Sequence, residues 1–126
     1  MRYAILAAIA ALSITTTAHA SSRPPWATIL NDEQWEAVQV FAPIDRYTMA
    51  RIAFCESRFD STAIGSMGER GAFQVMPQYW GYAGPSLFTQ ALQARDIMLM
   101  YGTYPWTTRD GCEQWDDEQR RLSLSS

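Results

Sequence analysis

The strongest constraint on the fold is a pair of cysteines, Cys55 and Cys112, in a chain whose N-terminus predicts export. They are the only cysteines among the 126 residues, and exported proteins meet an oxidising environment. We therefore expect a disulfide between them; the alternatives are two free buried thiols and a bridge to another molecule. In the chain-entropy model, closing a loop of this length stabilises the folded state by roughly 4 kcal/mol.

The prediction of export rests on residues 1–20. Arg2 is followed by an apolar run, Ala4–Leu12, and then by small and polar residues that end in Ala18-His19-Ala20. This order is typical of a secretory signal peptide, and the apolar run is too short to cross a membrane. The alternative is an uncleaved N-terminal anchor. Cleavage after Ala20 would leave residues 21–126, enough for one small domain that is secreted or periplasmic.

The charge of the chain argues against several classes of partner. The sequence has 10 Lys and Arg residues against 13 Asp and Glu, and all ten basic residues are arginines without a basic cluster. Nucleic acids and anionic membranes are therefore not expected partners. Two cysteines and, after cleavage, no histidine predict no metal site, and we expect no cofactor and a monomer.

Caps and apolar spacing predict a mainly helical domain over residues 31–118. Residues 21–30 are Ser- and Pro-rich at their start and are expected to be a tether, and residues 119–126 a C-terminal tail. A first helix is expected after Asn31, which has Gln34 at the capping-box position. A second helix is expected to begin at Asp45.

A third helix is expected after Ser86, with Leu87, Ala91, Ala94, Met98 and Tyr101 on one face and Gly102 at its end. The segment from Asp60 to Gly71 is rich in Ser, Thr and Gly, which is typical of a loop or hairpin. The stretch "GAFQV" that follows predicts a short strand, and Pro77 predicts the start of another helical turn.

Glu56 lies on the apolar face of the second helix. Met49, Ile52 and Ala53 precede it by seven, four and three residues, so the carboxyl group falls on the buried stripe. Burial in an apolar pocket raises the pKa of a carboxyl group and keeps its proton available. Such a neutral acid can protonate the leaving oxygen of a glycosidic bond. The alternative is a helix-end glutamate that binds a backbone amide or an arginine.

The residues after Glu56 form a motif: Glu56-Ser57-x-Phe59, followed by Gly68-x-x-Gly71-x-x-Gln74-x-Met76-Pro77. This motif resembles the lytic transglycosylase (SLT) domain of the lysozyme-like superfamily. The resemblance implies a mainly α, lysozyme-like α+β fold with a short β-hairpin or loop beside a peptidoglycan-binding cleft.

The resemblance also implies roles for single residues. Glu56 would be the sole catalytic acid/base, Gln74 and Met76 would line the saccharide subsites, and Ser57 would orient the helix end. Gly71 fits independently, because a backbone that passes close to a sugar leaves no room for a side chain. Tyr79 and Tyr101 are candidates for stacking on sugar rings; the alternative is that they belong to the core.

The C-terminal part resembles a different branch of the same fold. Many lytic transglycosylases carry an Ala-Tyr-Asn-Ala-Gly stretch, whereas here "LMYGTYPW" keeps Tyr101 and has Gly102 in place of Asn. Sugar contacts from that side are therefore not implied. The ending "IMLMYGTYPWTTRDGC" is similar to resuscitation-promoting factors, and this similarity also implies pairing of Cys55 with Cys112.

The reaction depends on whether a second carboxylate takes part. A lytic transglycosylase needs one acid, because the substrate's own 6-hydroxyl attacks the anomeric carbon, whereas an inverting hydrolase needs a second carboxylate to activate water. "GERG", residues 68–71, resembles a stretch of goose-type lysozymes and makes Glu69 a candidate; alternatively, Glu69 is a solvated charge paired with Arg70. Asp60 and Asp96 are weaker candidates.

We therefore expect an exported enzyme that cuts peptidoglycan glycan strands as a lytic transglycosylase with 1,6-anhydro products. An inverting, lysozyme-type hydrolase that uses Glu69 is the first alternative. A non-catalytic cell-wall-binding module is an alternative of another class.

Overall fold

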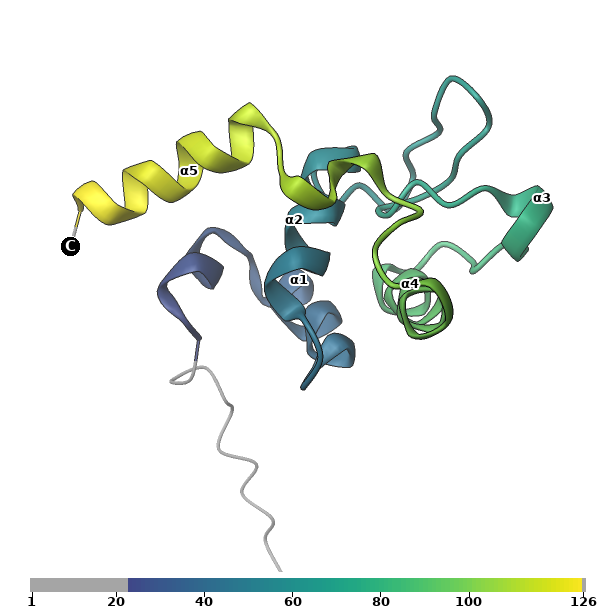
Figure 1. Ribbon diagram of the computed structural model, residues 1–126, viewed down its shortest axis with the longest axis horizontal. Coiled ribbons are helices and arrows are strands. Elements are labelled where there is room, and N and C mark those ends of the chain that lie inside the picture. The colour runs from purple at the N-terminus through teal and green to yellow at the C-terminus, as the bar shows by residue number, and fades with distance from the viewer. Residues whose placement is uncertain (1–22, 126) are drawn as a thin grey trace, which may run out of the picture.

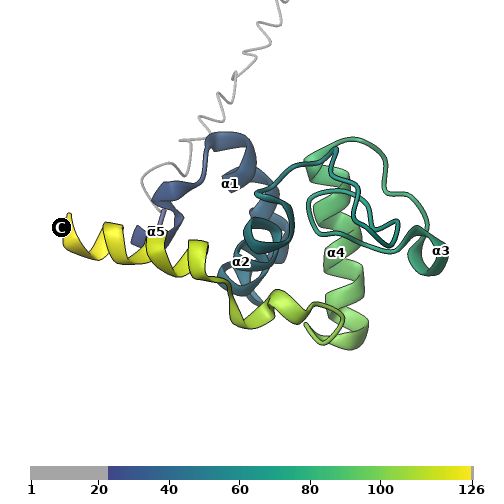
Figure 2. The ribbon, with the colours of Figure 1, turned by 90° about the horizontal axis from the view of Figure 1, so that it is seen from above.

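Helix α2 (Arg46–Ser57) lies in the middle of the molecule, between α1 and α4 on one side and α5 on the other (Figures 1 and 2). The computed structural model describes residues 23–125, so the predicted signal peptide lies outside the described residues. The fold is mainly helical and forms one small domain. The remaining elements are η2 (Pro25–Ile29), α1 (Asp32–Val38), η3 (Gln39–Phe41), α3 (Pro77–Trp80), α4 (Leu87–Tyr101), η4 (Thr107–Asp110) and α5 (Glu113–Leu124).

Local signals in the sequence explain where the main helices begin. The Asn31 side chain accepts a hydrogen bond from the Gln34 amide, and the Gln34 side chain accepts one from the Asn31 amide, which completes the predicted capping box of α1. Asp45 caps α2 through the Thr48 amide, and Ser86 caps α4. The predicted helix starts are therefore confirmed.

Helix α4 packs as predicted over most of its length. Its buried residues include Leu87, Ala91, Ala94 and Met98, and the helix ends at Gly102, which has a φ of 65°. Tyr101, predicted on the same stripe, is 56% exposed. The helix ends there, and the ring of Tyr101 lies against Trp80 with ring centroids 5.5 Å apart.

The loop between α2 and α3 contains no strand within the described residues, so the predicted strand at "GAFQV" is wrong. Arg70 instead forms two isolated antiparallel bridges, one to Ile64 and one to Val75. Between Arg70 and Val75 the chain turns, because Gln74 adopts a left-handed conformation with a φ of 48°. A single residue bridged on both sides holds the loop in shape without an extended strand.

The expected tether is wrong for the described residues 23–30. Ala27 and Leu30 are buried, and the Trp26 ring packs against Tyr47 and Trp115, with ring centroids 5.3 and 6.5 Å apart. The Pro-rich start suits this segment, because proline fits the first turn of a helix. Aromatic burial therefore makes these residues part of the domain.

The expected C-terminal tail is also helical up to Leu124, because α5 continues through it. Its Gln119 side chain donates a hydrogen bond of 3.1 Å to the Trp26 carbonyl, so α5 and η2 lie together. Figures 1 and 2 show the C-terminal end of α5 extending away from α2 and α4. Within the described residues, no helix is both long and apolar enough to cross a membrane.

The predicted disulfide between Cys55 and Cys112 is present, with Cα atoms 5.8 Å apart. Cys55 lies in the last turn of α2, and Cys112 lies between η4 and α5. The bond therefore fastens the C-terminal segment to the end of the helix that carries Glu56.

A Cys55→Ser/Cys112→Ser variant is expected to lower the Tm by on the order of 15 °C or more, because a loop with a sequence separation of 57 regains its freedom in the unfolded chain. Differential scanning calorimetry measures the change. Dithiothreitol should lower the Tm of the natural protein by a similar amount and leave that of the variant unchanged. Labelling of two free thiols in the unreduced, unfolded protein would contradict the bridge.

Candidate active site

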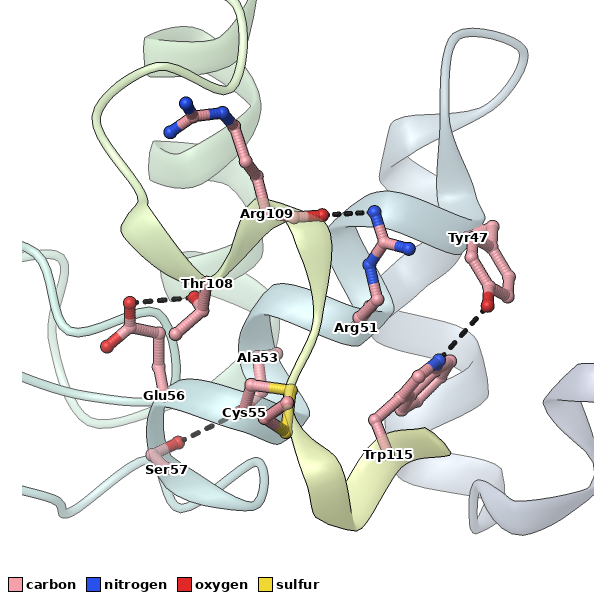
Figure 3. The surroundings of a disulfide bond; sticks show 10 residues. Tyr47, Arg51, Ala53, Cys55, Glu56, Ser57, Thr108, Arg109 and Trp115 are labelled. Atoms are coloured by element: carbon pink, nitrogen blue, oxygen red, sulfur yellow. Dashed lines mark hydrogen bonds between the residues drawn. A yellow bond between two sulfur atoms is a disulfide. The ribbon is translucent and has the colours of Figure 1, made fainter. Parts of the chain in front are cut away.

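Glu56 is half-buried at the end of α2, and its carboxyl group faces η4 (Figure 3). The Thr108 hydroxyl donates a hydrogen bond of 2.8 Å to Oε1 of Glu56. Burial raises the pKa of Glu56, the Thr108 hydrogen bond opposes this rise, and the negative charge of Glu69 adds to it. The net result is a raised pKa, which favours the neutral acid expected from the sequence.

Ser57 connects the end of α2 to the following loop. Its hydroxyl donates a hydrogen bond of 2.7 Å to the Ala72 carbonyl and accepts one of 3.1 Å from the Asp60 amide. The chain leaves the helix through Arg58 and Phe59, both in the left-handed region with φ of 57° and 60°. The Ser57 hydroxyl thus binds backbone groups, which agrees with a role in orienting the helix end.

Glu69 and Gln74 meet over Gly65. A side chain at Gly65 would collide with Oε2 of Glu69 and would lie 2.5 Å from Oε1 of Gln74, so it would displace these two side-chain ends from their present positions. Oε2 of Glu69 also accepts a hydrogen bond of 3.2 Å from the Met67 amide. Glu69 is therefore a half-buried carboxylate whose position is defined by the loop.

One alternative from the sequence was that Glu69 pairs with Arg70, and this alternative is wrong. Within the described part of the chain, no ion pair joins these two residues. The Arg70 guanidinium instead lies over the Tyr82 ring, 5.9 Å from its centroid. The charge of Glu69 remains close enough to Glu56 to raise the pKa of that acid.

Three of the predicted substrate-binding residues, Gln74, Met76 and Tyr79, line one pocket of about 210 Å³. Trp80, Pro105 and Trp106 contribute further walls. Gln74 donates a hydrogen bond of 2.9 Å to the Gly71 carbonyl, which fixes its side chain within the loop.

Tyr101 is not among the residues that line this pocket. Its ring packs against Trp80, a residue of the pocket wall, and it is 56% exposed. Tyr79 is also largely exposed and lies at the rim. The structure therefore places Tyr79 at the pocket and Tyr101 behind its wall.

Gly71 serves packing against Gln90, which the sequence analysis did not identify. A side chain at Gly71 would lie 2.5 Å from Oε1 of Gln90, and the φ of Gly71 is 79°. Gln90 is buried, accepts a hydrogen bond from the Ala72 amide and donates to the Ser61 and Gly84 carbonyls. The glycine is thus explained by the loop's attachment to α4, in contrast to the expected close approach of a sugar.

Thr108 was also missed by the sequence analysis. It lies 52 residues after Glu56 in the chain, and no local pattern reveals a hydrogen bond over that distance. One signal was available: the predicted disulfide to Cys55 brings the residues just before Cys112 close to the neighbouring Glu56.

Comparisons with protein-family models, with curated proteins and with solved structures find no match to this chain. The resemblance to lytic transglycosylases therefore rests on the motif residues themselves. Among the described residues, no three His, Cys, Asp or Glu side chains come together as a group that could hold a metal ion.

The raised pKa of Glu56 predicts a cost in stability at neutral pH. Between the ordinary glutamate pKa and the raised one, the folded state binds a proton that the unfolded state does not, so stability falls as pH rises through this window. Glu56→Gln should therefore raise the Tm at pH 7, and the difference should disappear below the ordinary pKa.

Thermal unfolding at pH 7 and in acid checks this expectation. Glu36→Gln, at an exposed position of α1, is the matched control and should show no such difference. Equal stability of Glu56→Gln and the natural protein at pH 7 would show that burial does not penalise the charge of Glu56.

Proposed function

We propose that this chain is an exported peptidoglycan lytic transglycosylase that cleaves the β-1,4 bond between MurNAc and GlcNAc with Glu56 as its only acid/base. The observation that carries the proposal is a half-buried carboxyl group with a raised pKa at the head of the motif. The predicted leader and the Cys55–Cys112 disulfide support a location in the cell envelope or outside the cell.

The chemistry requires one group that donates and then accepts a proton. The carboxylic acid of Glu56 protonates the glycosidic oxygen, and the bond between this oxygen and the anomeric carbon breaks. The 6-hydroxyl of the same sugar then attacks the anomeric carbon, and its proton returns to the Glu56 carboxylate. The 1,6-anhydro ring closes without consuming water, and Glu56 ends protonated as it began.

The pocket of Gln74, Met76 and Tyr79, which Glu56 does not line, supports the proposal through its composition. Gln74, Met76 and Tyr79 combine an amide, a flexible thioether and an aromatic ring around about 210 Å³. Apolar and aromatic walls with a few polar groups are typical of small-ligand sites. Gln74, which lines the pocket, belongs to the same loop as Glu69. Its side chain lies beside the Glu69 carboxylate over Gly65.

A second candidate, an inverting hydrolase, is favoured by Glu69 itself. Its carboxylate is half-buried, has no ion pair with Arg70 within the described residues, and acts on the pKa of Glu56. Such a group could serve as the base that activates water. The same charge also helps a one-acid mechanism, because it keeps Glu56 protonated and favours positive charge at the anomeric carbon.

Glu56→Gln is expected to abolish cleavage of purified peptidoglycan while preserving the fold and glycan binding, because the amide has the same shape and no acidic proton. Wall turbidity and sedimentation measure cleavage and binding, and Glu36→Gln is the control. Activity within about tenfold of the natural protein would exclude Glu56 as the acid. If the natural protein sediments with the wall without clearing it, the chain is a binding module.

Glu69→Gln distinguishes the two reactions. On the alkaline limb of the pH–rate profile, activity falls because Glu56 loses its proton. Loss of the Glu69 charge also lowers the pKa of Glu56, so the rates should be compared at a pH below this limb. A transglycosylase should stay within about tenfold of the natural rate, whereas a hydrolase should lose about 10²–10⁴ with its general base. Mass spectrometry identifies the products, since anhydro ends are lighter than reducing ends by one water. A large loss together with reducing ends would establish the hydrolase.

A further inference from the structure

We propose that Thr108 positions the carboxyl group of Glu56 for proton donation, and that the Cys55–Cys112 disulfide holds Thr108 in place. This inference rests on the proposed function, because it assigns a role within the same site. Thr108 acts through Glu56 and is therefore a positioning residue.

The hydrogen bond distinguishes the two oxygens of Glu56. Oε1 accepts the bond of 2.8 Å from Thr108, whereas Oε2 has no hydrogen-bond partner among the described residues. Figure 3 shows Thr108 against one oxygen and the other oxygen pointing away from it. A neutral acid that accepts at Oε1 carries its proton on Oε2. The proton is then on the oxygen that is open to a substrate.

Thr108 belongs to a segment that is fastened on several sides. Before it, the Trp106 indole donates a hydrogen bond of 2.8 Å to the Phe73 carbonyl. After it, Arg51 of α2 donates to the Arg109 carbonyl, and Cys112 is bonded to Cys55 (Figure 3). Because these contacts order the segment before substrate binds, Thr108 can hold Glu56 with little further loss of conformational freedom.

Gly111 allows the segment to pass close to α2. Its φ is 105°, and a side chain at this position would lie 3.2 Å from Cδ of Arg51. The short η4 helix can therefore lie directly on α2 and present Thr108 to Glu56. The disulfide then closes the same segment one residue later, at Cys112.

The charged groups around Glu56 determine the direction of the expected pH effect. Glu69 lies on the loop and raises the pKa of Glu56 together with burial, whereas the Thr108 hydrogen bond lowers it. From α2 and η4, the guanidinium groups of Arg51 and Arg109 are directed away from the Glu56 carboxyl group (Figure 3). Asp110 follows on η4 and lines a pocket with these two arginines. Loss of the hydroxyl should therefore raise the pKa of Glu56.

The test compares Thr108→Val, which keeps the shape without the donor, with Thr108→Ser, which keeps the donor. The valine variant should lose about tenfold in kcat with little change in KM, and the alkaline limb of its pH–rate profile should move to higher pH. The serine variant should restore both the kcat and the pH of the alkaline limb to the values of the natural protein. Unchanged pH dependence in the valine variant, or failure of serine to restore it, would overturn the proposal.

The role of the disulfide is tested by combination. Cys55→Ser/Cys112→Ser, measured at a temperature where it is folded, should shift the alkaline limb in the same direction as Thr108→Val. In the Thr108→Val background, removal of the disulfide should add no further shift, because both changes remove the same hydrogen bond. Additive shifts would show that the disulfide does not act through Thr108.

An NMR titration of the Glu56 side-chain carbon separates this proposal from the proposed function. The pKa of Glu56 should rise in Thr108→Val and return in Thr108→Ser whether or not the protein cleaves peptidoglycan. Inactivity of the natural protein together with this pattern would overturn the assigned reaction and leave the Thr108–Glu56 interaction established. Cleavage without any pKa change would overturn the role of Thr108.

Discussion

The bond between Cys55 and Cys112 is the constraint on which the arrangement of the site depends. Cys55 precedes Glu56 in α2, and Cys112 follows η4, so one covalent link brings the acid and η4 together. The hydrogen bond from Arg51 to the Arg109 carbonyl also holds η4 against α2. The disulfide adds to the stability that the buried core provides, because it limits the freedom of the unfolded chain. The bond thus contributes both to the fold and to the surroundings of Glu56.

The acidity of Glu56 reflects a balance between two parts of the structure. Burial raises its pKa, and the charge of Glu69 on the loop raises it further, while the hydrogen bond from Thr108 lowers it. The loop can bring Glu69 close because Gly65 leaves room for its carboxylate beside Gln74. These opposing influences leave the pKa of Glu56 raised, which favours the protonated form that a one-acid mechanism requires.

The residues of the motif have different roles in this structure. Gly71 makes room for the buried Gln90, which attaches the loop to α4 through backbone hydrogen bonds. Ser57 ties the end of α2 to the same loop at Ala72. These contacts stabilise the shape of the site, whereas the pocket residues are the ones available to a ligand. A motif in the sequence can therefore combine residues that shape a site with residues that act in it.

The helix starts, the pairing of Cys55 with Cys112 and the place of Glu56 on the apolar face of α2 could be predicted from the sequence. The helix starts and the position of Glu56 depend on hydrogen bonds and apolar spacing within a few residues, such as the caps at Asn31 and Asp45. The disulfide prediction rests instead on the number of cysteines and the expected export. The packing of distant segments was needed to show that Thr108 donates a hydrogen bond to Glu56, that Trp26 packs against the core, and that Arg70 lies over the Tyr82 ring. These outcomes depend on segments distant in the chain, whose packing no local pattern encodes.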